Sequence, residues 1–125
     1  MFRLFKKRRS AVQFTDELLK EFELVLSEAS GILRSSGYAV QANWLKKILT
    51  STLEQDKARF SKLVLSSEFL GGSGSVIDVD IRDKEKMSRF KQLIVRLYHL
   101  IRAAGLKDRA LNRLKYQLAY IYYRY

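Results

Sequence analysis

The sequence predicts an all-α, single-domain bundle of about five helices with one short extended, glycine-rich connector. Three observations predict this class. The chain has 125 residues and no proline, so no residue of that kind interrupts a helical pattern. Apolar residues make up 47% of it and recur at helical spacing in five stretches. Five of the six glycines lie between these stretches and divide the chain.

The first two helices are expected on either side of Gly37. The first begins between Ser10 and Thr15 and ends near Ser36, because apolar residues from Leu18 onward follow the helical period. Gly37 stands where a glycine commonly closes a helix. The second helix runs from about residue 39 to residue 53. Its inward positions are Ala42, Leu45, Ile48 and Leu49, with Trp44 beside them.

A third helix is expected from about Asp56 to Ser67, and a glycine-rich block follows it. The block consists of Gly71, Gly72, Gly74, Ser75 and Asp78. Its glycines indicate a tight passage that needs a positive φ or a close approach of the backbone. Residues 76–81 then alternate apolar and acidic side chains, the period of a half-buried strand. Because the chain offers no second strand, this segment is either an extended connector across the bundle or an edge that awaits another strand.

Two further helices complete the bundle. The fourth has Asp83 as its N-cap, runs to Ala104 and is closed by Gly105. It carries an apolar seam of Met87, Phe90, Ile94, Leu97, Tyr98 and Ile101. The fifth runs from residue 108 to residue 125. Its inward face consists of Leu111, Leu114, Leu118, Ile121 and Tyr122.

Residues 1–10 are expected to form a basic N-terminal segment before the single helical domain, residues 11–125. Within it, residues 2–9 combine aromatic and basic side chains, a composition that favours weak contact with an anionic membrane surface. No apolar stretch approaches the roughly 20 residues of a membrane span. The segment also lacks the apolar core of a signal peptide, and the chain contains no cysteine. We therefore expect a cytoplasmic location.

Charge is distributed unevenly along the chain, whose formal net charge is +11. The first ten residues hold five cations and no acid, and residues 11–81 hold seven cations against ten acids. Residues 82–125 hold twelve cations against three acids. Such asymmetry indicates how partners are attracted rather than which fold forms.

The sequence offers little for catalysis or metal binding. His99 is the single histidine and there is no cysteine, which excludes Cys–His pairs and two-histidine metal sites. No Gly-x-Ser-x-Gly elbow supports a serine nucleophile. The glycine block lacks the lysine of a phosphate-binding loop, and Asp78, Asp80 and Asp83 lack the other ligands of a calcium loop. We therefore expect a binding protein, not an enzyme, with no cofactor and no metal.

The last helix carries the first candidate binding surface. At 100° per residue, its tyrosines and arginines gather on the side opposite the apolar face. They are Arg109, Arg113, Tyr116, Tyr120, Tyr123 and Arg124. Tyr and Arg often carry the binding energy of protein interfaces, so a protein partner is predicted here. In the competing interpretation this helix is central and packs on both faces.

Nucleic acid is the alternative partner. Cations interleaved with aromatic rings suit phosphate neutralisation and base stacking, as in proteins that bind RNA or single strands. No RNA- or DNA-binding motif accompanies them. A third interpretation of the basic surplus is a solvated face that keeps the bundle soluble.

Two segments carry a family resemblance. One is the run from Ile32 to Leu45, in which a leucine-containing helix is followed by Gly37 and then Trp44-Leu45. The other is the Gly-Gly-x-Gly-Ser-x-x-Asp block of residues 71–78. Together with the helix from residue 87 to residue 100, they resemble small bacterial helical proteins of the toxin-immunity kind, found beside contact-dependent or polymorphic toxins. Ser73 and Ile77 depart from that pattern, which more often has Met and Asn there.

The resemblance implies a protein that binds and blocks a cognate toxin domain, and it implies no catalytic residue. The basic C-terminal half departs from the acidic character usual in partners of nuclease toxins. Either the toxin is acidic, or the contact uses the carboxylates of the first helix. That alternative acidic face consists of Glu17, Glu21 and Glu28. The sequence alone leaves both faces open.

Overall fold

The helices of this chain form three layers. The computed structural model describes the backbone of residues 12–124 and the side chains of residues 12–120. Its elements are α2 (Asp16–Ser35), α3 (Ala39–Leu53), α4 (Lys57–Val64), α5 (Ser67–Leu70), the 3₁₀ turn η1 (Val76–Asp78), α6 (Lys84–Ala103) and α7 (Arg109–Arg124). No β-strand occurs between residues 12 and 124, so the prediction of an all-α bundle is confirmed. The basic segment predicted at residues 1–10 lies outside the described residues.

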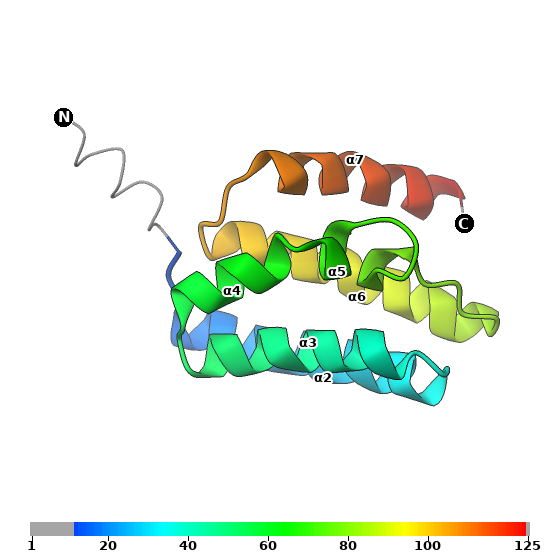
Figure 1. Ribbon diagram of the computed structural model, residues 1–125, viewed down its shortest axis with the longest axis horizontal. Helices are drawn as coiled ribbons and strands as arrows, with labels where there is room; N and C mark the ends of the chain where they lie inside the picture. The colour runs from blue at the N-terminus through cyan, green and yellow to red at the C-terminus, as the bar shows by residue number, and fades with distance from the viewer. Residues whose placement is uncertain (1–11, 125) are drawn as a thin grey trace.

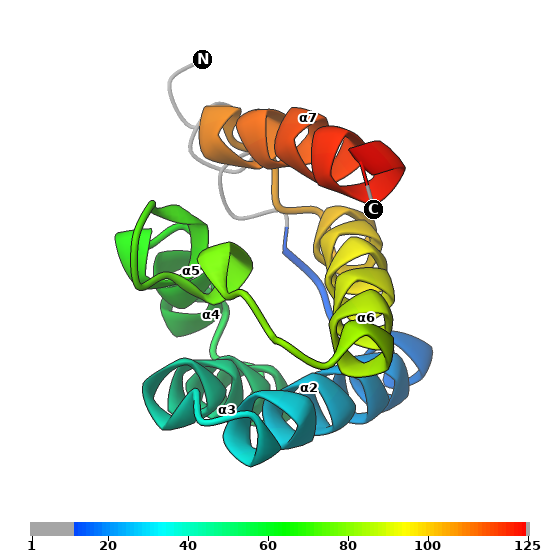
Figure 2. The ribbon, with the colours of Figure 1, turned by 90° about the vertical axis from the view of Figure 1, so that its right-hand side faces the viewer.

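Figures 1 and 2 show how the layers are arranged. Helices α2 and α3 form an antiparallel pair at the bottom of both views. In the middle layer, α4 and α5 lie over α3 while α6 lies over α2. Helix α7 covers the other side of the middle layer and is therefore at the periphery of the bundle.

Side-chain caps explain where the helices begin. The Thr15 hydroxyl accepts a hydrogen bond from the Leu18 amide at 3.1 Å, and the Asp56 carboxylate accepts one from the Arg59 amide at 3.1 Å. Asp83, the predicted N-cap of the fourth helix, accepts from the amides of Glu85 and Lys86. These carboxylates and hydroxyls satisfy amides that have no partner within the helix.

Glycines with positive φ close two of the helices, as predicted. Gly37 follows α2 with φ 90°, and Gly105 follows α6 with φ 100°. Residues with a Cβ rarely adopt this conformation, so glycine is favoured at both turns. The first, second and fourth helices consequently match their predicted bounds within one or two residues.

The third predicted helix ends earlier than expected, at Val64 instead of Ser67. Ser66 has an extended backbone, with φ −77° and ψ 159°, and its hydroxyl donates to the Leu63 carbonyl at 2.6 Å. This serine therefore interrupts the helix, and the four-residue α5 starts immediately after it.

The connector between α5 and α6 is only partly extended. A single 3₁₀ turn occupies residues 76–78, where a strand-like period was expected. From Val79 to Ile81 the prediction holds, because Val79 and Ile81 are buried while Asp80 between them is exposed. The Tyr38 hydroxyl donates to the Asp80 carbonyl at 2.8 Å and accepts from the Asp80 amide at 3.2 Å. One side chain thus makes the bonds that a neighbouring strand would make.

Aromatic rings join the layers in the core. Phe22 of α2 and Phe60 of α4 are fully buried, and their ring centroids lie 5.6 Å apart in an edge-to-face arrangement. Phe14, which precedes α2, contacts both rings in the same manner. The Gln13 amide donates to the Ala104 carbonyl at 2.7 Å, so the segment before α2 is also attached to the end of α6.

Among the described residues, no helix is long and apolar enough to cross a membrane.

Candidate functional site: the outer face of helix α7

Helix α7 is amphipathic and presents one face to solvent. Leu111, Leu114 and Leu118 are buried against the bundle, as predicted. Tyr116 and Tyr120 lie on the other side, with 74% and 64% of their surface exposed. The competing interpretation, that this helix is central and packs on both faces, is therefore wrong for residues 109–120.

The arginines predicted to accompany these tyrosines are exposed as well. Arg109 lies two turns before Tyr116, and Arg113 lies one turn before it. We call Arg109, Arg113, Tyr116 and Tyr120 the α7 face. Tyr123 and Arg124 were predicted to belong to it, and their side chains lie outside the described residues.

The glycine block borders the α7 face. A cleft of about 210 Å³ separates the two segments. Its walls are Leu70, Gly71, Gly72, Ile77 and Asp78 on one side, and Gln117 and Tyr120 of α7 on the other. Two features that lie far apart in the sequence therefore meet at one place.

The block is built as a tight backbone passage, as its glycines predicted. Gly74 has φ 86°, and its carbonyl accepts a hydrogen bond from the Gln41 side-chain amide at 2.9 Å. Ser75 is buried, and its hydroxyl oxygen has no hydrogen-bond partner among the described residues. The Asp78 side chain is exposed at the mouth of the cleft.

Gly71→Ala is expected to lower the free energy of unfolding by about 1–3 kcal/mol, the usual cost of forcing a methyl group into packed structure. A Cβ at Gly71 would overlap the backbone carbonyl oxygen of Ser67, which cannot swing away as a flexible side chain would. Gly72→Ala is the matched control, because a Cβ there meets nothing within 4 Å. Thermal unfolding of both variants checks this, and equal melting temperatures would contradict it.

The alternative acidic face on α2 is largely engaged within the protein. Arg89 of α6 makes a bidentate pair with Glu28, at 2.6 and 2.7 Å. Arg96 of α6 also forms an ion pair with Glu21, through one nitrogen only. Glu17 is exposed. Two of the three predicted carboxylates therefore join α2 to α6 and already have a cationic partner.

The Arg89–Glu28 pair changes the titration of both groups. The hydrogen bond from Arg89 holds the pKa of Glu28 below its usual value, and Glu28 raises the pKa of Arg89. Because the pKa of Glu28 is lowered, the stabilisation is present above the ordinary carboxyl pKa and is lost as pH falls through the lowered value. Both side chains are about half exposed, so this stabilisation is small.

The cations of α7 have no such partner in the described part of the protein. The two ion pairs found among residues 12–120 both join α2 to α6. Arg109, Arg113 and Lys115 are exposed and take part in neither of them. Part of the positive surplus of the C-terminal region is therefore presented to solvent along α7.

Lys91 was not singled out by the sequence, yet it is the buried lysine of α6. Apolar residues surround it, among them Met87, Ile94 and Leu118. Burial lowers the pKa of Lys91, and Asp80 opposes that shift. The sequence pattern that could have predicted its burial is the position of Lys91 between Met87 and Ile94, on the inward face of the helix. Because only 8% of Lys91 is exposed, we assign it to the packing of α7 on α6.

The remaining candidates, His99 and the carboxylates, form no metal site in the described region. His99 is exposed on α6, and its ring lies edge-on to the Tyr98 ring with the centroids 5.4 Å apart. No group of three His, Cys, Asp or Glu residues within residues 12–120 could hold a metal ion.

Comparison with protein-family models, curated proteins and solved structures gives no match to this chain.

Proposed function

We propose that this chain is a cytoplasmic immunity protein that binds a cognate bacterial toxin domain and neutralises it by occlusion. The observation that carries the proposal is the α7 face. Two largely exposed tyrosines and two exposed arginines line one side of a helix whose other side is packed. Large rings on a fixed helix offer contact area with little loss of conformational entropy on binding.

The setting of the α7 face supports a folded protein as the partner. The adjoining cleft has both polar and apolar walls, including Asp78, Gln117 and Ile77. A protein surface can place a projecting side chain in such a cleft while its flatter parts cover Tyr116 and Tyr120. Inhibition by occlusion needs no catalytic group on the inhibitor, and it gains its rate of encounter from complementary charge.

The resemblance to bacterial immunity proteins supports a toxin as that partner. It rests on the glycine block, on Trp44-Leu45 and on the helix that follows the block. Of the two faces left open by the sequence, the α7 face is the better supported, since Glu21 and Glu28 are paired with arginines of α6. The proposed toxin domain consequently has an acidic contact surface.

A nucleic-acid-binding module is the second candidate, and one observation favours it. Tyr116 and Tyr120 are exposed rings spaced one helical turn apart, beside the cations Arg109 and Arg113. Exposed rings next to cations suit stacking on single-stranded bases, with affinity that falls steeply as salt increases.

Affinity capture from the native host tests the proposal against this alternative. The tagged full chain is used as bait at moderate salt, with and without nuclease, and bound proteins and nucleic acids are both identified. We expect one stoichiometric protein partner, a toxin domain with an acidic surface, whose recovery does not depend on nuclease. RNA or DNA that survives a competing polyanion, without any protein partner, would overturn the proposal.

A further inference from the structure

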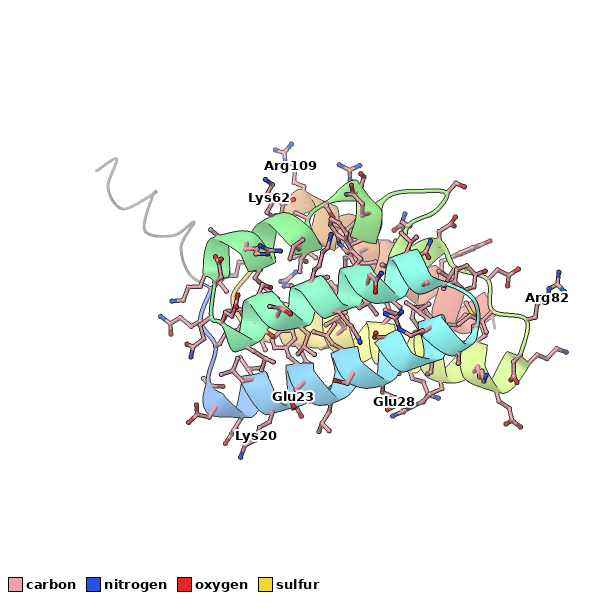
Figure 3. All side chains as sticks on the ribbon, turned by 60° about the horizontal axis from the view of Figure 1, so that its bottom comes forward. Lys20, Glu23, Glu28, Lys62, Arg82 and Arg109 are labelled. Atoms are coloured by element: carbon pink, nitrogen blue, oxygen red, sulfur yellow. The ribbon has the colours of Figure 1, made fainter. Side chains whose placement is uncertain are left out.

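Helix α4 adds cations to the edge of the molecule at which α7 begins. Figure 3 shows Lys62 of α4 and Arg109 of α7 projecting from the same edge. Arg59 lies one turn before Lys62, and Arg113 lies one turn after Arg109. All four side chains are exposed. We call Arg59, Lys62, Arg109 and Arg113 the basic edge.

The acids nearest to this edge in sequence are held at helix ends. Asp56 accepts a hydrogen bond from the first turn of α4, at the Arg59 amide. Asp108 accepts one from the first turn of α7, at the Ala110 amide, at 2.9 Å. Each carboxylate thus faces the positive end of a helix dipole. Neither forms an ion pair with a cation of the basic edge among the described residues.

Acids of α2 lie at the opposite edge of the molecule. In Figure 3, Glu23 and Glu28 of α2 lie at the edge away from Lys62 and Arg109. The two ion pairs that neutralise acids also lie at this α2–α6 edge. The cations of the basic edge are therefore separated from the acids of α2, and this separation can orient a charged partner during encounter.

We infer that the toxin-binding surface extends from the α7 face across the basic edge, and that it receives an acidic surface of a folded protein. This inference rests on the proposed function and names the chemistry of its partner. Guanidinium groups bind carboxylates through two parallel hydrogen bonds, and three of the four cations are arginines.

Carboxylates on a protein fit this edge better than the phosphates of a nucleic acid. Asp108 lies directly before Arg109, and Asp78 lies at the cleft beside Tyr120. A nucleic acid carries a phosphate on every nucleotide, so a strand following the edge would bring phosphates near these carboxylates. An acidic protein can place its carboxylates at the cations alone.

Charge reversal at matched positions tests the inference. Lys62→Glu with Arg109→Glu changes the basic edge, and Lys20→Glu with Lys46→Glu makes the same change in net charge at exposed positions of α2 and α3. The probes are a synthetic peptide of about ten glutamates and a uridine oligonucleotide of similar formal charge. Binding is followed by amide chemical shifts of the isotope-labelled full chain at low ionic strength.

We expect the edge variant to bind the glutamate peptide at least about tenfold more weakly than wild type, and the control variant to bind within about threefold of it. Shifts in wild type should lie on α4 and α7. Equal weakening by both variants would mean that only net charge matters and would overturn the inference. Tighter binding of the oligonucleotide than of the peptide under the same conditions would also overturn it, in favour of nucleic acid.

The same variants separate this inference from the proposed function. Suppose that the edge variant captures the host partner as well as wild type does, while loss of Tyr116 and Tyr120 prevents capture. The proposed function then stands, and the inference that the basic edge belongs to the toxin-binding surface is wrong. If wild type captures no protein partner at all, the proposed function itself fails. If the edge variant loses the partner and keeps its helical content, the inference is supported.

Discussion

Tyr116→Ala combined with Tyr120→Ala is expected to raise the dissociation constant for the protein partner by roughly 30- to 1,000-fold. This range corresponds to about 2–4 kcal/mol, the scale of central aromatic residues in protein interfaces. Both rings are more than 60% exposed, so their removal should leave the helical content of the free protein unchanged. Isothermal titration calorimetry gives the affinity, and circular dichroism gives the helical content.

Leu24→Ala combined with Val40→Ala is the matched control. These side chains are as exposed as the tyrosines, at 72% and 75%, and they lie on α2 and α3. The control should bind the partner with nearly wild-type affinity. A tyrosine variant that binds as tightly as wild type would remove the α7 face from the interface.

Phe60→Ala should produce the largest loss of stability among single substitutions in this protein. Replacing a buried phenylalanine with alanine commonly costs about 3–5 kcal/mol, and a folded domain has only about 5–15 kcal/mol in total. Phe60 is fully buried and contacts the rings of Phe14 and Phe22, so its loss disconnects α4 from α2. Urea denaturation measures the change in the free energy of unfolding.

Phe60→Leu provides the comparison, because it keeps the site apolar while removing the ring contacts. Its cost should lie well below that of the alanine variant. If Phe60→Ala lost less than about 1 kcal/mol, the ring cluster would not be tightly packed. Such a result would contradict the arrangement of α4 on the α2–α3 pair.

Much of the fold could be predicted because local signals agree with one another. For α3, the apolar period and the preceding Gly37 indicate the same bounds, Ala39–Leu53. The break after Val64 could not be predicted, since it depends on the extended backbone of Ser66 inside an apolar pattern. The turn at residues 76–78 was missed because Val76 and Val79 are three residues apart and both buried. Over six residues, that spacing is compatible with a 3₁₀ turn as well as with a strand.

The candidate site was predicted in part. The solvent-facing side of α7 follows from the helical period alone, which is why Arg109, Arg113, Tyr116 and Tyr120 were found. The cleft beside Tyr120 depends on how α7 packs against the connector, and no local pattern encodes that contact. The ion pair between Glu28 and Arg89 could not be predicted either, because the two residues are 61 positions apart in the sequence.

The charge pattern, too, could be predicted from the sequence only in part. The surplus of cations in residues 82–125 can be counted from the sequence. The sequence does not show that Arg89 and Arg96 are paired with acids of α2, nor that Lys62 of α4 and Arg109 of α7 project from the same edge of the molecule. Only the packing of α4, α6 and α7 separates paired cations from those presented to a partner.

Hydroxyl-radical footprinting of the protein with its captured partner is the most direct test of the α7 face as the binding surface. It reports the solvent exposure of individual side chains. We expect the partner to reduce oxidation of Tyr116 and Tyr120 strongly, while Leu24 and Val40 react as in the free protein. Unchanged oxidation of both tyrosines, with protection of Leu24 on α2, would contradict this and place the partner on α2.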